Sequence, residues 1–110
     1  MNKLSVLFVC LGNICRSPAA EAIFIDLINN KGLTDSFIVD SAGTGSWHVG
    51  KKADYRMRIA AENRGINILS RARQVNISDF EKFNYILTMD DSNFQNIINL
   101  KNRKFLSDFA

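Results

Sequence analysis

Cys10-Leu11-Gly12-Asn13-Ile14-Cys15-Arg16-Ser17-Pro18 is the stretch of sequence that decides the fold of this chain. The residues before it, Leu4-Ser5-Val6-Leu7-Phe8-Val9, form a short apolar run that indicates a buried parallel strand. Ser17 is a favoured N-cap residue and Pro18 a favoured first helical residue, so we expect a helix to begin there. The loop between strand and helix then lies where backbone N–H groups and the helix dipole favour a bound anion.

The residue types in this loop predict a thiol nucleophile beside a bound phosphate. The N–H groups and the Arg16 guanidinium favour the thiolate of Cys10, which is the attacking form of a cysteine. Arg16 offers a planar fork of donors to two phosphoryl oxygens, and Ser17 can donate a hydrogen bond to the sulfur as a phospho-cysteine breaks down. Gly12 lets the backbone approach a ligand closely, and Asn13 tolerates the left-handed backbone of a tight anion loop.

Two cysteines separated by four residues suggest other roles as well. A zinc site needs more ligands than the single histidine of the chain would add, so we expect neither a metal nor another cofactor. Cys10 and Cys15 could instead be small buried apolar residues, although the Gly-Asn and Arg-Ser-Pro around Cys10 argue against this. A disulfide between them under oxidising conditions would silence the nucleophile reversibly.

The loop also carries a family resemblance. Val9-Cys10-Leu11-Gly12-Asn13-Ile14-Cys15-Arg16-Ser17-Pro18 resembles the phosphate-binding loop of the low-molecular-weight protein tyrosine phosphatases. Further stretches match that family in the same order: Asp40-Ser41-Ala42-Gly43-Thr44, Trp47 followed by Gly50, Ala53-Asp54, Arg64-Gly65-Ile66, Ala72-Arg73-Gln74 and Tyr85-Ile86-Leu87-Thr88-Met89-Asp90. The resemblance covers essentially the whole chain. It implies metal-independent hydrolysis of a phosphotyrosine protein or an aryl phosphate through a phospho-cysteine, with inorganic phosphate as the product.

The resemblance also implies a role for each site residue. Cys10 would be the nucleophile, Arg16 the phosphate clamp and Ser17 the assistant to the sulfur. Asn13, Ser17 and Ser41 would form a hydrogen-bond network that holds the loop, and Trp47 would be a wall of the cleft. The alternative for Trp47 is a partly buried core aromatic, and His48 is expected to be a solvated loop residue. The residues expected to bind the substrate phosphate or its aromatic group are Leu11, Gly12, Asn13, Ile14, Cys15, Ser41 and Trp47.

The sequence departs from the family pattern in its general acid. The family supplies this acid from a late Asp-Pro-Tyr segment, but Pro18 is the only proline among these 110 residues. Asp108 matches a position before that segment, and Asp90 matches an aspartate near the cleft whose expected role is a supporting hydrogen bond. Without a positioned acid, expulsion of a tyrosine leaving group should slow by roughly 10²–10⁴-fold.

Two other functions remain open from the residues. The loop could serve a phosphate- or phosphopeptide-binding module that lacks efficient turnover. An arsenate reductase-like thiol enzyme would use a similar loop, but its disulfide relay needs further cysteines, and none follows Cys15.

Composition limits the remaining possibilities. A formal charge of +3 suits an anionic substrate, but the basic residues show no aromatic interleaving of the nucleic-acid-binding kind. No apolar run approaches the length of a membrane span, and no signal peptide is apparent. Two cysteines in such a chain fit a reducing cytoplasm. We therefore expect no nucleic-acid partner, no membrane partner and a cytoplasmic location.

Strand and helix patterns alternate along residues 1–110, which we interpret as a single domain. Helical spacing is seen in residues 20–28, 57–64 and 94–98, and strand patterns in residues 37–39 and 83–88, while Lys104-Phe105-Leu106 could start a fourth strand. The sequence therefore predicts an α/β fold: a three-layer, doubly wound parallel sheet of about four strands, with the phosphate loop between the first strand and the first helix. Because a late segment of the family pattern is missing, the domain is expected to be incomplete at its C-terminus. We expect a partner or a missing tail to cover the sheet face left exposed.

Overall fold

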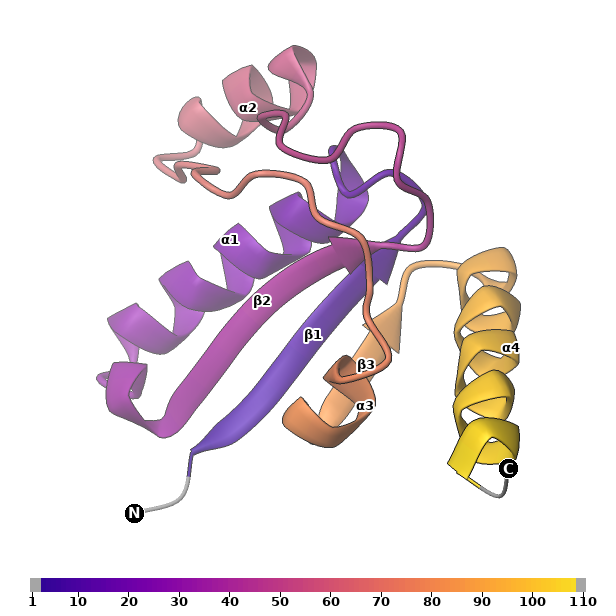
Figure 1. Cartoon of the computed structure of the whole chain (residues 1–110). Coiled ribbons are helices and arrows are strands. Elements are labelled where there is room, and N and C mark those ends of the chain that lie inside the picture. Colours follow the sequence, from indigo (N-terminus) through magenta and orange to yellow (C-terminus); the bar gives the residue numbers. More distant parts are fainter. Residues whose placement is uncertain (1–2, 109–110) are drawn as a thin grey trace.

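A computed structural model describes residues 3–108 of the chain, and the side chains of residues 3–103. Figure 1 shows strands and helices that alternate along the chain. In chain order the elements are β1 (Leu4–Cys10), α1 (Arg16–Asn30), a 3-10 turn (Thr34–Ser36), β2 (Phe37–Gly43), α2 (Tyr55–Glu62), α3 (Asp79–Lys82), β3 (Tyr85–Thr88) and α4 (Asp91–Asp108).

The sheet is parallel and has the strand order β2-β1-β3. In its register Cys10 at the end of β1 lies opposite Gly43 at the end of β2, and Val9 lies opposite Thr88 at the end of β3. Since parallel strands end at the same edge, residues that follow all three strands meet around Cys10. The predicted α/β class and parallel sheet are confirmed, and the site lies at the carboxyl edge of the strands.

The sheet has three strands within the described residues, rather than about four. Lys104-Phe105-Leu106, where a fourth strand was expected to start, belongs to α4 instead. No glycine or proline interrupts residues 92–108, so nothing in the sequence ends the helix before that segment. The expected fourth strand is therefore wrong.

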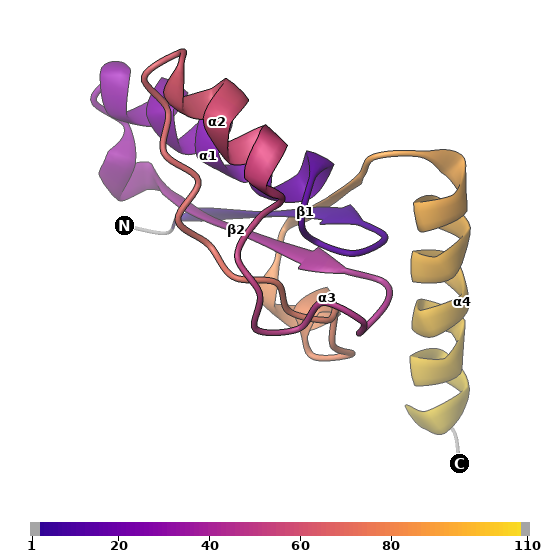
Figure 2. The same cartoon turned by 90° about the horizontal axis from the view of Figure 1, so that it is seen from above.

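Helices lie on both faces of the sheet, as the doubly wound prediction requires. On one face Phe8 packs edge-on against Phe24 of α1, with ring centroids 5.9 Å apart, and Phe24 packs against Phe37 at 5.3 Å. On the other face Leu7 and Val9 form the core with Ala42 of β2 and Ile97 of α4. Four partly buried side chains pack against this core: Val75, Phe80, Phe83 and Ile86. Figure 2 shows α1 and α3 on opposite sides of the sheet.

The α1 helix begins at Arg16, one residue before the predicted N-cap. Its N-cap is Cys15, which makes no side-chain capping hydrogen bond, so Ser17 and Pro18 are the second and third helical residues. Pro18 is tolerated there because the first N–H groups of a helix have no intrahelical partner. The predicted capping role of Ser17 is wrong because its hydroxyl contacts Cys10 and Asn13 instead.

One strip of the sheet carries exposed apolar side chains. Tyr85 and Leu87 are 54% and 46% exposed. They pair with Val6 and Phe8, so they point to the same face of the sheet as α1. The sequence predicted a partner or tail over an exposed sheet face without saying where, and a cover over this strip stays a prediction. Within the described residues, no helix is both long and apolar enough to cross a membrane.

Candidate active site

The thiol of Cys10 is held at the end of β1 by the start of α1. Its side chain is buried, at 4% exposure. The sulfur accepts a hydrogen bond from the backbone N–H of Asn13 at 3.2 Å and lies 2.9 Å from the Ser17 hydroxyl. The loop of residues 11–15 places the N-terminus of α1 beside this sulfur, and such an end favours negative charge. The arrangement can stabilise both a thiolate and a bound anion.

Asn13 ties the loop to the rest of the fold. Its φ of 58° is left-handed, a conformation that asparagine tolerates better than most residues. Its buried side-chain amide donates to the Ser17 hydroxyl at 2.8 Å and to the Ser41 hydroxyl at 3.0 Å. Its amide oxygen accepts the Arg73 backbone N–H at 3.0 Å. The structure thus brings together Asn13, Ser17 and Ser41, as the predicted network requires.

The network ends on a carboxylate that the sequence interpretation missed. The Ser41 hydroxyl donates to Glu21 Oε1 at 2.5 Å, so a chain of hydrogen bonds runs from Glu21 through Ser41 and Asn13 to Ser17. Burial raises the pKa of the Glu21 carboxyl above its ordinary value, although the hydrogen bond from Ser41 opposes the shift. Glu21 lies one helical turn after Ser17, so the only signal in the sequence was its position on the sheet-facing side of α1.

Arg16, at the start of α1, and Asp90, after the end of β3, form an ion pair. The Arg16 guanidinium donates through Nη2 to Asp90 Oδ2 at 2.9 Å, and both side chains are about half exposed. Asp90 Oδ1 also accepts the Asn93 backbone N–H at 2.8 Å. These two bonds lower the pKa of the Asp90 carboxyl below its ordinary value, the Asn93 amide more than Arg16. Asp90 is thus placed to orient Arg16, and its supporting role stays a prediction.

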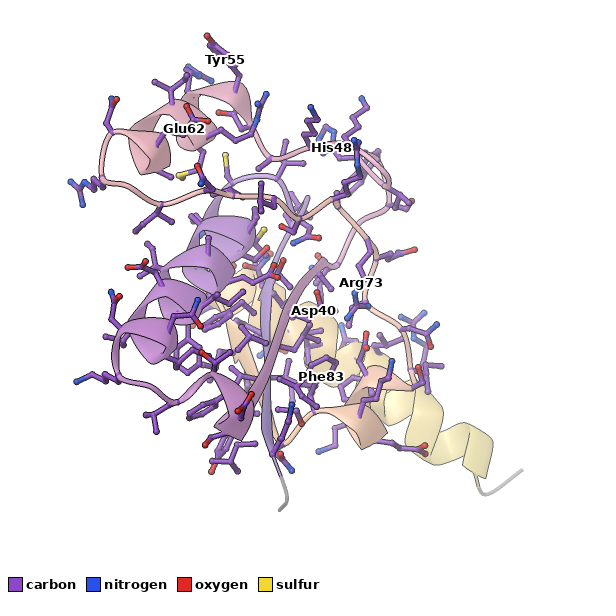
Figure 3. All side chains as sticks on the ribbon, turned by 90° about the vertical axis from the view of Figure 1, so that its left-hand side faces the viewer. Asp40, His48, Tyr55, Glu62, Arg73 and Phe83 are labelled. Carbon is purple, nitrogen blue, oxygen red and sulfur yellow. The ribbon has the colours of Figure 1, made fainter. Side chains whose placement is uncertain are left out.

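Arg73 is a second positioning group that the sequence interpretation left without a role. Its Nε donates to Asp40 at 3.1 Å, and its Nη1 and Nη2 donate to the buried Asp79 at 3.0 and 3.2 Å. Figure 3 shows Arg73 beside Asp40 of β2. Burial opposes the charge of Arg73, but the hydrogen bonds and charges of Asp79 and Asp40 outweigh it and raise its pKa. The Arg73 guanidinium therefore fixes its own backbone, whose N–H donates to the side-chain oxygen of Asn13.

Gly43 lies where no side chain fits. A Cβ on this residue would stand 2.7 Å from the Leu11 carbonyl oxygen and 3.1 Å from the Asn13 nitrogen, both backbone atoms. The next two residues continue the contact, since Thr44 N–H donates to the Cys10 carbonyl and Gly45 N–H to the Leu11 carbonyl, each at 2.9 Å. The backbone at the end of β2 therefore packs directly against the loop of residues 11–15.

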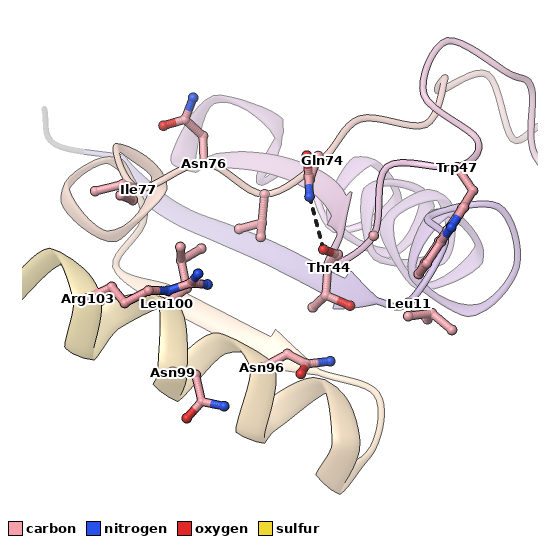
Figure 4. A pocket seen from close by; sticks show the side chains of 12 residues that line it. Leu11, Thr44, Trp47, Gln74, Asn76, Ile77, Asn96, Asn99, Leu100 and Arg103 are labelled. Carbon is pink, nitrogen blue, oxygen red and sulfur yellow. Dashed lines mark hydrogen bonds between the residues drawn. The ribbon is translucent and has the colours of Figure 1, made fainter.

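Trp47 and Leu11 lie at one end of a cavity of about 680 Å³. Figure 4 shows this cavity, with Gln74 and Asn76 on one side and α4 on the other. Trp47 is 68% exposed, and its ring lies against Gly45, where a Cβ would fall 1.8 Å from a ring carbon. Trp47 is therefore not a core aromatic, and its role as a wall for the substrate stays a prediction. The full lining is Leu11, Thr44, Gly45, Trp47, Gln74, Val75, Asn76, Ile77, Asn96, Asn99, Leu100 and Arg103.

His48 differs from the sequence interpretation. It is half-buried rather than solvated, and a Cβ added to Gly12 would stand 3.0 Å from its ring. The ring therefore covers the backbone of the phosphate loop.

Cys15 and Ile14 lie on the side of the loop that meets the start of α2. The Ile14 carbonyl accepts the Asp54 N–H at 2.6 Å. Burial raises the pKa of the Cys15 thiol, and the charge of Asp54 adds to the shift. Cys10 and Cys15 are both free thiols. In the described part of the chain, no three histidine, cysteine, aspartate or glutamate side chains gather as a metal site.

Comparison with known proteins places this chain in a family. A family model described as low molecular weight phosphotyrosine protein phosphatase matches residues 5–109. The protein of that name from Sus scrofa is 46% identical over 93 residues, which are 84% of this chain and 59% of that protein. The one from Schizosaccharomyces pombe is 48% identical over 100 residues, 90% of this chain and 64% of that protein. The chain thus spans about three fifths of the length of these curated relatives.

Solved structures agree with this placement. The crystal structure of a protein tyrosine phosphatase from Entamoeba histolytica superposes with a TM-score of 0.87 at 49% identity, covering 89% of this chain and 63% of that one. Fold and site together define a class: parallel α/β proteins with a buried cysteine between the first strand and the first helix, at the carboxyl edge of the sheet. Within that class, the chain belongs to the low molecular weight phosphotyrosine protein phosphatase family.

Proposed function

We propose that this chain hydrolyses phosphotyrosine and other aryl phosphates through a covalent phospho-cysteine. The observation that carries the proposal is the Cys10 sulfur, which is buried at the helix start within hydrogen-bond distance of the Asn13 amide and the Ser17 hydroxyl. The backbone N–H groups of residues 11–15 and the Arg16 guanidinium would receive the phosphate oxygens. The phosphate dianion then sits where the dipole of α1 favours it.

The chemistry would take two steps. In the first, the Cys10 thiolate attacks phosphorus, the S–P bond forms, the P–O bond to the phenol breaks, and the phenolate takes a proton. In the second, water attacks phosphorus, the S–P bond breaks, and inorganic phosphate leaves with the proton balance closed by solvent. Ser17, at 2.9 Å from the sulfur, would donate a hydrogen bond to the departing thiolate. Arg16 would stabilise the charge on the transferred phosphoryl group in both steps.

Steady-state turnover of p-nitrophenyl phosphate tests this proposal. We expect Cys10→Ser to abolish turnover, while Lys31→Ala, an exposed change beyond the far end of α1, leaves it unchanged. Turnover that survives Cys10→Ser would contradict the proposal. A burst of p-nitrophenol without steady turnover would instead support a phosphate-binding module that traps the phosphoryl group.

Protonation of the leaving group has no assigned residue in these 110 residues, since they contain no Asp-Pro-Tyr segment. We therefore propose that this chain releases poor leaving groups slowly, by roughly 10²–10⁴-fold relative to an enzyme with a positioned acid. A series of aryl phosphates with phenols of different acidity tests this point. We expect kcat/KM, which reports the step in which the phenol leaves, to rise steeply as the phenol becomes more acidic, whereas a flat series would show that some residue already donates the proton.

Trp47 would contact the aromatic ring of the substrate. The support is its place beside Leu11 at the end of the cavity, with the ring held against Gly45. We expect Trp47→Ala to raise KM for phosphotyrosine peptides more than for acetyl phosphate, which has no ring. An equal rise for both would place Trp47 outside the substrate site.

We also propose a cytoplasmic location and a covered sheet face. A thiol nucleophile needs a reducing compartment, and both cysteines are free. The exposed strip of Tyr85 and Leu87 fits a partner or further chain packed beside α1. Cell fractionation tests the first point. Hydrogen exchange on β3, compared between this chain and an extended one, tests the second: added protection is expected, and unchanged exchange would contradict it.

A further inference from the structure

Half of the basic residues of the chain lie in one segment. Residues 51–73 contain seven lysines and arginines but only two acidic residues, so this segment carries a formal charge of +5. The whole chain carries +3, so the remaining residues together carry −2. Arg73 is neutralised by Asp40 and Asp79, and Arg64 lies beyond the C-terminal end of α2. We call the other five the basic rim: Lys51, Lys52, Arg56, Arg58 and Arg71.

The backbone fixes the basic rim against the phosphate loop. Asp54 N–H donates to the Ile14 carbonyl at 2.6 Å, and Ala72 N–H donates to the Lys51 carbonyl at 2.8 Å. Lys52 and Arg71 pair across an antiparallel bridge. Figure 3 shows His48, Tyr55 and Glu62 at one end of the molecule, above Arg73 and Asp40. Backbone hydrogen bonds therefore join the segment that carries the rim to the loop of residues 11–15.

The charges of residues 51–73 act on the Cys15 thiol of the loop. Burial and the charge of Asp54 raise the pKa of the Cys15 thiol, and the Arg56 guanidinium opposes this shift. Asp54 is the N-cap of α2 and accepts the Arg56 and Met57 N–H groups, so part of its charge is already engaged. Glu62 is the other carboxylate of the segment, and it lines a small hollow with Lys52, Arg58 and Arg71. Three cations around one carboxylate leave that hollow with an excess of positive charge.

The cations of the rim keep donors for a ligand. Lys51 and Lys52 are exposed, and Arg56 is 93% exposed at 3.9 Å from Asp54. Arg71 uses one nitrogen on the Gly50 carbonyl and Arg58 uses Nε on the Ala53 carbonyl, which leaves the other guanidinium nitrogens for further bonds. A guanidinium held in this way is ready for a carboxylate.

We propose that the basic rim binds acidic side chains next to the phosphotyrosine, so that acidic phosphopeptides are the preferred substrate class of this chain. The inference rests on the proposed function, because a peptide phosphotyrosine in the loop must bring its flanking residues past the basic rim. An exposed ion pair is expected to contribute between about 1.4-fold and 5-fold in affinity, so two or three pairs give roughly tenfold in kcat/KM at low salt. The preference should shrink as salt is added, because exposed charges are screened.

The experiment compares kcat/KM for two phosphotyrosine peptides of equal length, one with aspartates and glutamates around the phosphotyrosine and one with serines and glutamines. p-Nitrophenyl phosphate serves as a substrate without flanks. The test variant is Lys51→Glu with Lys52→Glu, whose side chains are exposed, and Arg71→Glu is a second, independent variant. The matched control is Lys31→Glu with Lys82→Glu, which changes the net charge equally but lies outside the rim.

We expect wild type and the matched control to favour the acidic peptide about tenfold. The preference should fall to about twofold or less in Lys51→Glu with Lys52→Glu and by about 1.4- to 5-fold in Arg71→Glu, while turnover of p-nitrophenyl phosphate is kept in both. Equal rates for the two peptides in wild type, or a preference that survives undiminished in both rim variants, would overturn the proposal. So would a loss of preference in the matched control, which would reduce the effect to net charge. Rim-dependent binding to phosphatidylserine vesicles without a peptide preference would assign the rim to a membrane surface and also overturn it. Absence of Cys10-dependent turnover of p-nitrophenyl phosphate would be a failure of the proposed function itself.

Discussion

Replacement of Asn13 by alanine tests the physical basis of the site most sharply, since one side chain carries two buried hydrogen bonds and a third that is partly buried. Asn13→Ala removes the bonds to Ser17 and Ser41 and leaves the Arg73 amide without its acceptor. At about 1 kcal/mol for each bond, this loss lowers the free energy of unfolding by roughly 3 kcal/mol. The left-handed φ of 58° adds about 1 kcal/mol, because alanine tolerates it less well than asparagine.

Asn13→Gly separates the two contributions. Glycine removes the same side chain but accepts the left-handed backbone, so we expect it to be about 1 kcal/mol more stable than the alanine variant. A total loss of about 4 kcal/mol would be a large part of the stability of a domain of this size.

Urea unfolding followed by far-ultraviolet circular dichroism is the suitable assay, because Trp47 is 68% exposed and reports weakly on burial. With a slope of about 2 kcal/mol per molar urea, the midpoint should fall by about 2 M for alanine and about 1.5 M for glycine. Turnover of p-nitrophenyl phosphate should fall in both variants under conditions where they remain folded. A drop below about 0.5 M in the alanine variant would refute the reasoning that Asn13 holds the loop.

Other perturbations follow from the same geometry. Because the pKa of Glu21 is raised in the folded state, its contribution to stability is present below the ordinary value of 4.5 and is lost as pH rises through the raised pKa. Glu21→Gln should remove this loss of stability. The free energy of unfolding of the variant should therefore rise relative to that of wild type as the pH increases, and a difference that stays constant with pH would contradict this. Gly43→Ala should cost about 2 kcal/mol or more in urea unfolding because its Cβ would meet backbone, and a change below about 0.5 kcal/mol would show that the loop can move aside. Asp90→Asn should leave the urea midpoint nearly unchanged, since the pair with Arg16 is half exposed, yet lower kcat/KM for p-nitrophenyl phosphate roughly tenfold or more. Unchanged kinetics would mean that Asp90 does not orient Arg16.

The sequence predicts best what depends on local pattern. The apolar run of β1 is buried on both faces of the sheet, and a parallel strand of this kind has an almost continuous apolar sequence. The loop after it follows from the same stretch, because Asn13 and Gly12 are residues that a tight anion loop requires. Both features could therefore be placed without knowledge of distant contacts.

Local rules fail where distant groups compete for the same atoms. Ser17 has the sequence signature of an N-cap, but its hydroxyl serves Cys10 and Asn13, and the helix begins one residue earlier. The residues Lys104-Phe105-Leu106 have a strand-like composition, yet they continue α4 because periodicity in a short apolar run does not distinguish strand from helix.

Contacts between positioning residues that are far apart in the sequence could not be predicted from it. Arg73 meets Asn13 across sixty positions of the chain, and its guanidinium joins Asp40 to Asp79. No spacing rule connects these residues, because only the packing of the segment after α2 against β2 brings them together. The half-buried His48 is a similar case, since its contact with Gly12 depends on how the loop after β2 folds back.

The central claim is that the Cys10 sulfur forms a bond to phosphorus during turnover, and a rapid quench into alkaline denaturant, in which an S–P bond survives, tests it most directly. The protein is mixed with p-nitrophenyl phosphate, quenched within the first turnover, digested and read by mass spectrometry. We predict a phosphoryl group on the peptide that contains Cys10, and none on that peptide in Cys10→Ser. Turnover without a phosphorylated protein, or with the phosphoryl group on another residue, would contradict it.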